Sequence, residues 1–136
     1  MRLVICATVK DEALYLAKWI EHHRSIGFDR LLLYDDGSAD VTRCVLDAYA
    51  RRSDVTRIPE DVGAHHMEDL PWRHKGQILD NPQQAIFEAG RRYLVDRERD
   101  SGEVGSTWML TSDVNEFLWF HRESAQGPAN AKDALS

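Results

Sequence analysis

The first forty residues decide the fold, and they read MRLVICATVKDEALYLAKWIEHHRSIGFDRLLLYDDGSAD. Residues 3–9 form a nearly continuous apolar run, which predicts a strand covered on both faces. Residues 31–34 are a second such run, which the turn sequence at 35–38 ends sharply. Between them, apolar side chains recur at helical spacing, and Gly27 is placed to end that helix. Strand, helix and strand in this order predict parallel strands joined by a right-handed crossover.

Two helices are expected in this first half of the chain. Asp11 and Glu12 place negative charge in the first turn of the first helix. Its expected buried face comprises Ala13, Leu16, Ala17, Trp19, Ile20 and His23 or Arg24. For the second helix, Ser38 or Asp40 is the expected cap. The side chains expected to share its buried face are those of Val41, Cys44, Val45 and Ala48.

The pattern continues less regularly after a weaker third strand at residues 54–58. Residues 60–81 lack periodicity and predict a long loop. A third helix is expected to begin at Asn81, with a buried stripe formed by Ile86, Ala89, Tyr93 and Leu94. Strands are expected at 107–111 and 116–120. Residues 121–136 have the composition of a flexible tail, so we expect one domain at 1–120 followed by that tail.

Composition limits the class of protein. The 136 residues carry 23 acidic and 17 basic side chains, for a net charge of −6, which argues against a general nucleic-acid binder. No apolar run approaches the roughly 18 residues of a transmembrane helix, and the first apolar run is too short for a signal peptide. Cys6 and Cys44 form no disulfide framework and are interpreted as buried free thiols. Composition therefore predicts a single-domain cytoplasmic protein, and the alternation of strands and helices predicts an α/β class with a parallel sheet.

Acidic clusters follow three of the predicted strands. They are Asp11-Glu12, Asp35-Asp36 and the segment of Asp113, Asn115 and Glu116. Ligands of open parallel sheets bind outside the carboxyl ends of the strands, so these clusters predict a binding site. The chain has no glycine-rich phosphate loop, and a bound diphosphate would need a metal ion. The oxygens of the last cluster suit Mg²⁺ or Mn²⁺.

Each cluster also has a purely structural interpretation. Asp11-Glu12 is an ordinary helix start, and residues 35–38 form a good turn and cap sequence. The segment at 113–116 is harder to explain structurally, because three polar residues interrupt two apolar stretches without glycine or proline. His65-His66 with Glu68-Asp69 lacks the ligand spacing of a zinc site and is interpreted as a solvated loop.

The order of these segments resembles a known family. The stretch KDEALYLAKWIEHH at 10–23, Gly27 and the stretch YDDGSAD at 34–40 are similar to the opening of family 2-like glycosyltransferases. The resemblance is strongest to the subgroup related to glycosyltransferase family 92. Gln84 and the stretch WMLTSDVNEFL at 108–118 resemble later motifs of that subgroup. The similarity runs in the right order from about residue 3 to 120.

The resemblance implies a GT-A fold, an α/β, Rossmann-like and mostly parallel sheet flanked by helices. Such a sheet binds a nucleotide-diphosphate sugar for transfer to a hydroxyl acceptor. It assigns the nucleotide sugar to Thr8, Lys10, Glu12, Asp35, Asp36, Gln84 and Asp113. It assigns a divalent cation, Mn²⁺ or Mg²⁺, to Asp113 and Asn115, with Glu116 beside them. Such a cation would stabilise the negative charge that develops on the departing diphosphate.

Two departures from the family pattern lead to a rival hypothesis. Asn115 stands where the family motif has Asp, which removes a charge from the metal site. The acceptor-binding half and the catalytic base lie beyond a segment of this length, so the sheet is expected to be truncated and no base is nominated. The rival is a degenerate, non-catalytic nucleotide-sugar-binding or interaction module; a weaker alternative is an unrelated doubly wound domain. An unfinished sheet edge also predicts a homodimer or poor solubility.

Overall fold

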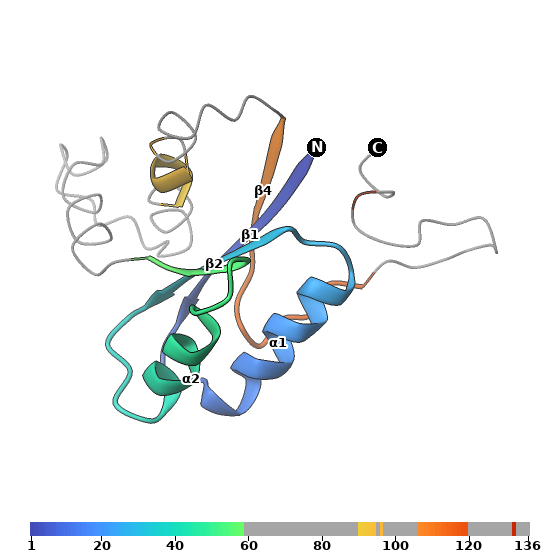
Figure 1. Ribbon diagram of the computed structural model, residues 1–136. Coiled ribbons are helices and arrows are strands. Elements are labelled where there is room, and N and C mark those ends of the chain that lie inside the picture. Colours follow the sequence, from blue (N-terminus) through green and yellow to red (C-terminus); the bar gives the residue numbers. More distant parts are fainter. Residues whose placement is uncertain (59–89, 95, 97–105, 120–131, 133–136) are drawn as a thin grey trace, which may run out of the picture.

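A four-stranded parallel sheet organises the part of the chain that the computed structural model describes, which is residues 1–58, 90–94, 96, 106–119 and 132 (Figure 1). The strand order is β3-β2-β1-β4, and every neighbouring pair is parallel. The elements are β1 (Arg2–Val9), α1 (Ala13–Ser25), β2 (Arg30–Asp35), α2 (Thr42–Tyr49), β3 (Val55–Arg57) and β4 (Thr107–Thr111). The expected α/β, Rossmann-like parallel sheet is confirmed.

Strand β1 lies at the centre of the sheet and is covered on both faces. Leu3 and Ile5 point into a cluster with Leu16 and Ile20 of α1 and with Leu46 of α2. The alternate residues of β1, which are Val4 and Cys6, pack on the opposite face with Leu32, Ile58 and Leu94. This double coverage explains why the first strand is apolar at almost every position instead of alternating.

A helical turn at residues 90–94 covers the second face of the sheet. Leu94 is buried there and Tyr93 packs partly buried beside it, as the sequence predicted. A Cβ added at Gly90 would lie 3.0 Å from the Sγ of Cys6, so glycine allows this backbone to approach β1 closely. Burial raises the pKa of the Cys6 thiol to about 12, which keeps it protonated. Cys6 is therefore the buried free thiol that was expected.

The start of α1 differs from the prediction. The helix begins at Ala13, and Asp11 and Glu12 precede it instead of forming its first turn. Asp11 has a φ of 51°, a left-handed conformation that cannot belong to a right-handed helix. At the other end, Gly27 follows the C-cap with a φ of 105°, as its position predicted.

The buried face of α2 is also different from the predicted one. Thr42 and Leu46 are buried, whereas Val41 is 62% exposed and Cys44 is exposed, so the prediction of a buried Cys44 is wrong. The predicted and observed faces have the same helical spacing and differ by one residue. The observed face buries Leu46 and packs Val45 and Tyr49 against the core, and these side chains remove more apolar area from water than Cys44 and Ala48 would.

The remaining predictions divide between tested and untested segments. Residues 116–119 form no strand, so the short strand expected at 116–120 is wrong over that range. The predicted loop at 60–81, the helix start at Asn81, and Gln84, Ile86 and Ala89 lie outside the described residues. So does the predicted tail except for Lys132, whose Nζ lies 2.6 Å from Oδ1 of Asp29. Within the described ranges, none of the helices has the length and apolar character needed to cross a membrane.

Strand β4 is the outermost described strand on its side of the sheet. Trp108 and Leu110 stand on β4 with 54% and 42% of their surfaces exposed. Their register partners on β1 are Leu3 and Ile5, which places them on the face that α1 and α2 cover further along the sheet. The homodimer expected from an uncovered edge stays a prediction.

The face of α2 can be tested by two substitutions. Leu46→Ala is expected to lower the free energy of unfolding by about 2–5 kcal/mol, because it leaves a cavity in the core. Val41→Ala removes an exposed side chain and is expected to change that free energy by no more than about 0.5 kcal/mol. Urea denaturation of both variants measures the difference, and a larger loss for Val41→Ala would contradict the observed face.

Candidate functional site

The carboxyl ends of β2, β1 and β4 are neighbours at one edge of the sheet. Asp35, the last residue of β2, pairs in register with Val9, the last residue of β1. On the other side, the N–H of Ser112 donates to the carbonyl of Cys6, and Asp113 follows directly. The parallel topology thus brings the three acidic clusters to the same edge, as the sequence predicted.

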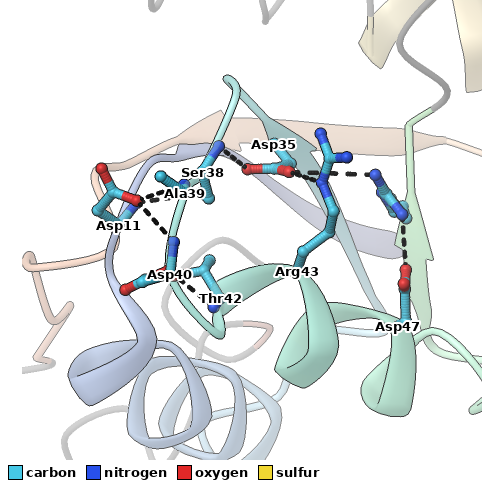
Figure 2. A network of polar contacts seen from close by, with 9 residues as sticks. Asp11, Asp35, Ser38, Ala39, Asp40, Thr42, Arg43 and Asp47 are labelled. Carbon is cyan, nitrogen blue, oxygen red and sulfur yellow. Dashed lines mark hydrogen bonds and ion pairs between the residues drawn. The ribbon is translucent and has the colours of Figure 1, made fainter.

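Asp35 is buried, and its carboxylate binds groups of the chain itself (Figure 2). One carboxylate oxygen accepts the N–H of Ser38 at 3.0 Å, and the other accepts Nε–H of Arg43 at 2.8 Å, with the guanidinium of Arg57 at 4.0 Å. Burial alone would raise the pKa of Asp35, but the hydrogen bonds from Ser38 and Arg43 outweigh it and lower the pKa. Asp35 is therefore an ionised anchor of the loop that follows β2, and its contact with a nucleoside stays a prediction.

The loop after β2 is joined to the loop after β1. The N–H of Asp36 donates to the carbonyl of Val9 at 2.8 Å. The N–H of Asp11 donates to Oγ of Ser38, and the Asp11 carboxylate accepts the N–H of Ala39 at 2.8 Å (Figure 2). Asp36 itself is exposed and begins the loop after β2, which the end of β1 holds in place.

The other residues predicted near β1 lie at the same edge. Thr8 is half-buried, and its hydroxyl oxygen has no hydrogen-bond partner among the described residues. Lys10 is exposed. Glu12 is half-buried, and its carbonyl accepts the N–H groups of Tyr15 and Leu16 at the start of α1. Predicted site residue Gln84 lies outside the described residues.

The acidic segment after β4 forms a turn closed by its own side chain. The N–H of Asp113 donates to a carboxylate oxygen of Glu116 at 3.1 Å, and the N–H of Glu116 donates to the carbonyl of Asp113 at 2.9 Å. Val114 is buried beneath the turn, while Asn115 and Glu116 are exposed. Across the described part of the chain, no group of three His, Cys, Asp or Glu side chains is arranged to hold a metal ion. The predicted cation site stays a proposal.

Helix α1 binds the segment that follows this turn. The indole N–H of Trp19 donates to the carbonyl of Glu116 at 2.9 Å, and Nε2–H of His22 donates to the carbonyl of Leu118 at 2.7 Å. Nδ1 of His23 lies 2.8 Å from the carbonyl of Trp19 and must donate, so its Nε2 accepts the N–H of Leu118 at 3.5 Å. We call these contacts of Trp19, His22 and His23 the α1 clamp.

The α1 clamp does not follow from the sequence pattern. The pattern places Trp19 on the apolar face of α1 and offers His23 only as one of two alternatives there. The adjacent pair His22-His23 on a helix that packs against a sheet was the available signal, because a buried imidazole needs polar partners. The ring of Phe117 lies against both histidine rings, with centroid distances of 5.3 Å to His22 and 6.2 Å to His23.

His23 is held in its neutral form. Burial lowers the pKa of His23 to about 4, against the upward effect of its hydrogen bond with the Trp19 carbonyl, and neighbouring His22 lowers it further. A neutral ring with its proton on Nδ1 leaves Nε2 free to accept from Leu118. Protonation of Nε2 would remove that acceptor, so the clamp depends on a neutral His23.

Comparison with known proteins adds a family relationship. The family model described as glycosyltransferase family 92 matches residues 2–73. A glycosyltransferase family 92 protein of Oryza sativa subsp. japonica is 30% identical over 119 residues, which are 87% of this chain and 16% of the relative. The chain therefore spans about a sixth of the length of that relative.

Two solved structures are also similar to this chain. They are the crystal structure of S. aureus TarS 1–349 and the structure of the same protein in complex with UDP. Their sequence identities are 11% and 12%, and each has a TM-score of 0.49. Each match covers 86% of this chain and 28% of the TarS chain.

The neutral, buried His23 predicts a loss of stability in acid. Its pKa in the folded chain, about 4, lies below the value of 6.5 expected when it is exposed, so its contribution is complete above pH 6.5. As the pH falls from 6.5 towards 4, the unfolded chain takes up the proton and the folded chain does not. Urea denaturation across this range is expected to show wild type losing stability faster than His23→Gln, which cannot titrate. Parallel losses in the two proteins would contradict this assignment.

Proposed function

The chain belongs to glycosyltransferase family 92, and from this premise we propose that it binds a nucleotide-diphosphate sugar at the carboxyl edge of the sheet. The observation that supports the proposal most is the joining of the strand ends. Backbone N–H groups of the loop after β2 donate to the carbonyl of Val9 and to the carboxylate of Asp11, which joins this loop to the end of β1. Strand β4 brings Asp113 beside β1. The reaction that we propose for the whole protein is glycosyl transfer to a hydroxyl acceptor.

The nucleoside would lie between the ends of β1 and β2. Asp36 offers an exposed carboxylate, which can accept hydrogen bonds from a ribose hydroxyl or a base N–H. The Thr8 hydroxyl oxygen is buried and has no hydrogen-bond partner within the described chain, and its contact with the ligand is a further part of the proposal. Lys10 is exposed and can approach a phosphate as a mobile positive charge. Asp35 would act by holding the loop, and Glu12 and Gln84 remain proposed contacts.

A divalent cation, Mn²⁺ or Mg²⁺, is proposed to bind at the turn after β4. Asp113 and Asn115 supply a carboxylate and an amide oxygen, both of which suit a hard cation. One oxygen of Glu116 accepts the N–H of Asp113, which leaves the other for a metal or for water. When bound, the cation would stabilise the charge of the departing diphosphate. The α1 clamp binds the backbone of residues 116–118 and so holds the turn with its proposed ligand oxygens at the edge of the sheet.

A second function is favoured by the same turn. Asn115 provides no charge, and Glu116 is partly occupied by closing the turn. A site with this donor set fits a module that binds a nucleotide sugar without transferring it. The two functions differ in turnover, which an assay of sugar transfer or donor hydrolysis with purified chain measures. The cytoplasmic location and the homodimer also stay predictions.

Donor binding is tested by isothermal titration calorimetry of the full chain. UDP-glucose, UDP-N-acetylglucosamine and GDP-mannose are titrated with and without MnCl₂, and saturable binding of at least one donor is expected. Asp36→Ala is expected to weaken that binding by about tenfold or more, since it removes a charged hydrogen-bond acceptor. Glu21→Ala, which changes an exposed carboxylate of α1 that pairs with Arg24 and Arg52, is the control. Absence of binding by every donor would refute the proposal.

The cation site is tested separately by titrating the protein with MnCl₂ and following free Mn²⁺ by electron paramagnetic resonance. Asn115→Asp adds a carboxylate charge and is expected to tighten Mn²⁺ binding, whereas Asp113→Ala is expected to weaken it. Thermal unfolding of both variants verifies that the turn still folds. Equal Mn²⁺ affinity in wild type and both variants would contradict a cation site at this turn.

A further inference from the structure

We propose that Asp11 is a positioning residue that holds the loop carrying Asp36 in the geometry that binds the nucleotide. The inference rests on the proposed function. The sequence pattern counts Asp11 only as a member of the acidic cluster after β1, and the family resemblance assigns it no role; the inference gives it a specific one. Asp11 was expected to start α1, but it stands before the helix at the junction between β1 and α1. Its contacts run to the loop after β2.

The backbone of Asp11 is unusual within the described residues. It is the one non-glycine residue there with a positive φ, at 51°. Left-handed backbone is unfavourable for most side chains, and aspartate and asparagine tolerate it best. Glycine would fit this conformation more easily, but glycine has no side chain that could reach the neighbouring loop. The presence of a carboxylate at a position that suits glycine indicates that the side chain has a task.

That task is visible in the hydrogen bonds. One oxygen of the Asp11 carboxylate accepts two neighbouring backbone N–H groups, from Ala39 at 2.8 Å and from Asp40 at 3.3 Å (Figure 2). The N–H of Asp11 donates to Oγ of Ser38 at 3.0 Å. The carboxylate of Asp40 in turn accepts the N–H of Thr42 at the start of α2. Asp11 therefore connects the end of β1 to the whole stretch between β2 and α2.

The hydrogen bonds fix the loop at Asp36 itself and again at the residues that follow it in the sequence. Its own N–H is fixed to the carbonyl of Val9, and the loop beyond it is fixed to Asp11. The loop also contains Gly37, whose φ of 75° lets the chain turn sharply between the two fixed points. Without the Asp11 carboxylate, the N–H groups of Ala39 and Asp40 lose their partner and the loop gains freedom. Ser38 would still be held by the Asp35 carboxylate and the Asp11 N–H, but the segment that follows it would lose its anchor. Ordering this loosened loop around Asp36 on ligand binding would cost affinity.

Three substitutions of Asp11 separate positioning from a purely structural role. Asn keeps the oxygen acceptor and tolerates left-handed backbone. Gly removes the acceptor and relieves the backbone, whereas Ala removes the acceptor and keeps the strain. Thermal unfolding is expected to rank Ala below Gly in stability. The nucleotide affinities of the Gly and Ala variants are expected to be equally low despite their different stabilities, because both variants lack the carboxylate.

The test measures the affinity of the full chain and the three variants for UDP and for GDP, each with MnCl₂, by calorimetry. Asp11→Gly and Asp11→Ala are expected to weaken binding by similar factors of about 5–30, while Asp11→Asn stays close to wild type. Amide hydrogen exchange at Ala39 and Asp40 is expected to accelerate in the Gly and Ala variants only. Affinity that follows thermal stability, with Asp11→Gly binding like wild type, would overturn the inference.

The same experiment distinguishes failure of the proposed function from failure of the inference about Asp11. Wild-type protein that binds neither nucleotide refutes the proposed function, and this inference with it. Wild-type protein that binds a nucleotide with the same affinity as all three variants refutes the inference alone and leaves the proposed function standing.

Discussion

The binding of residues 116–118 to α1 is the interaction on which the arrangement of the site depends. Trp19, His22 and His23 make hydrogen bonds to backbone atoms that lie 95–97 positions away in the sequence. Strand β4 alone would supply a parallel neighbour for β1. The α1 clamp fixes the segment after β4, at residues 116–118. The turn at Asp113 is thereby held at the strand ends where the loops after β1 and β2 are joined.

The sheet could be predicted from the sequence because its signals are local. The apolar runs at 3–9 and 31–34 predict all four ends of β1 and β2 to within one residue. Gly27 follows the end of α1, where its lack of a side chain permits a positive φ. The buried face of α2 could not be predicted in the same way. Two faces with the same spacing competed, and tertiary packing of Leu46 against the sheet decided between them.

The position of the candidate site could be predicted from the sequence, but the hydrogen-bond partners of its carboxylates could not. Parallel strands bring their carboxyl ends together by topology, so three acidic clusters at one edge follow from the strand pattern. The groups that bind each carboxylate come from other segments of the chain, and only the fold brings them close. Arg43 and Arg57 neutralise Asp35, and Ala39 and Asp40 bind Asp11. A sequence pattern shows which carboxylates gather at an edge, and the fold determines which of them the chain itself uses.

We propose the carboxyl edge of the sheet as the nucleotide-binding surface of this chain. Mapping of backbone amide chemical shifts during titration with UDP or GDP and Mg²⁺ tests this proposal most directly. The largest shifts are expected at residues 8–12, at Asp36 to Ser38 and around Asp113. Shifts confined to the opposite edge, near Asp29 and the start of β2, or no shifts at saturating nucleotide, would contradict it.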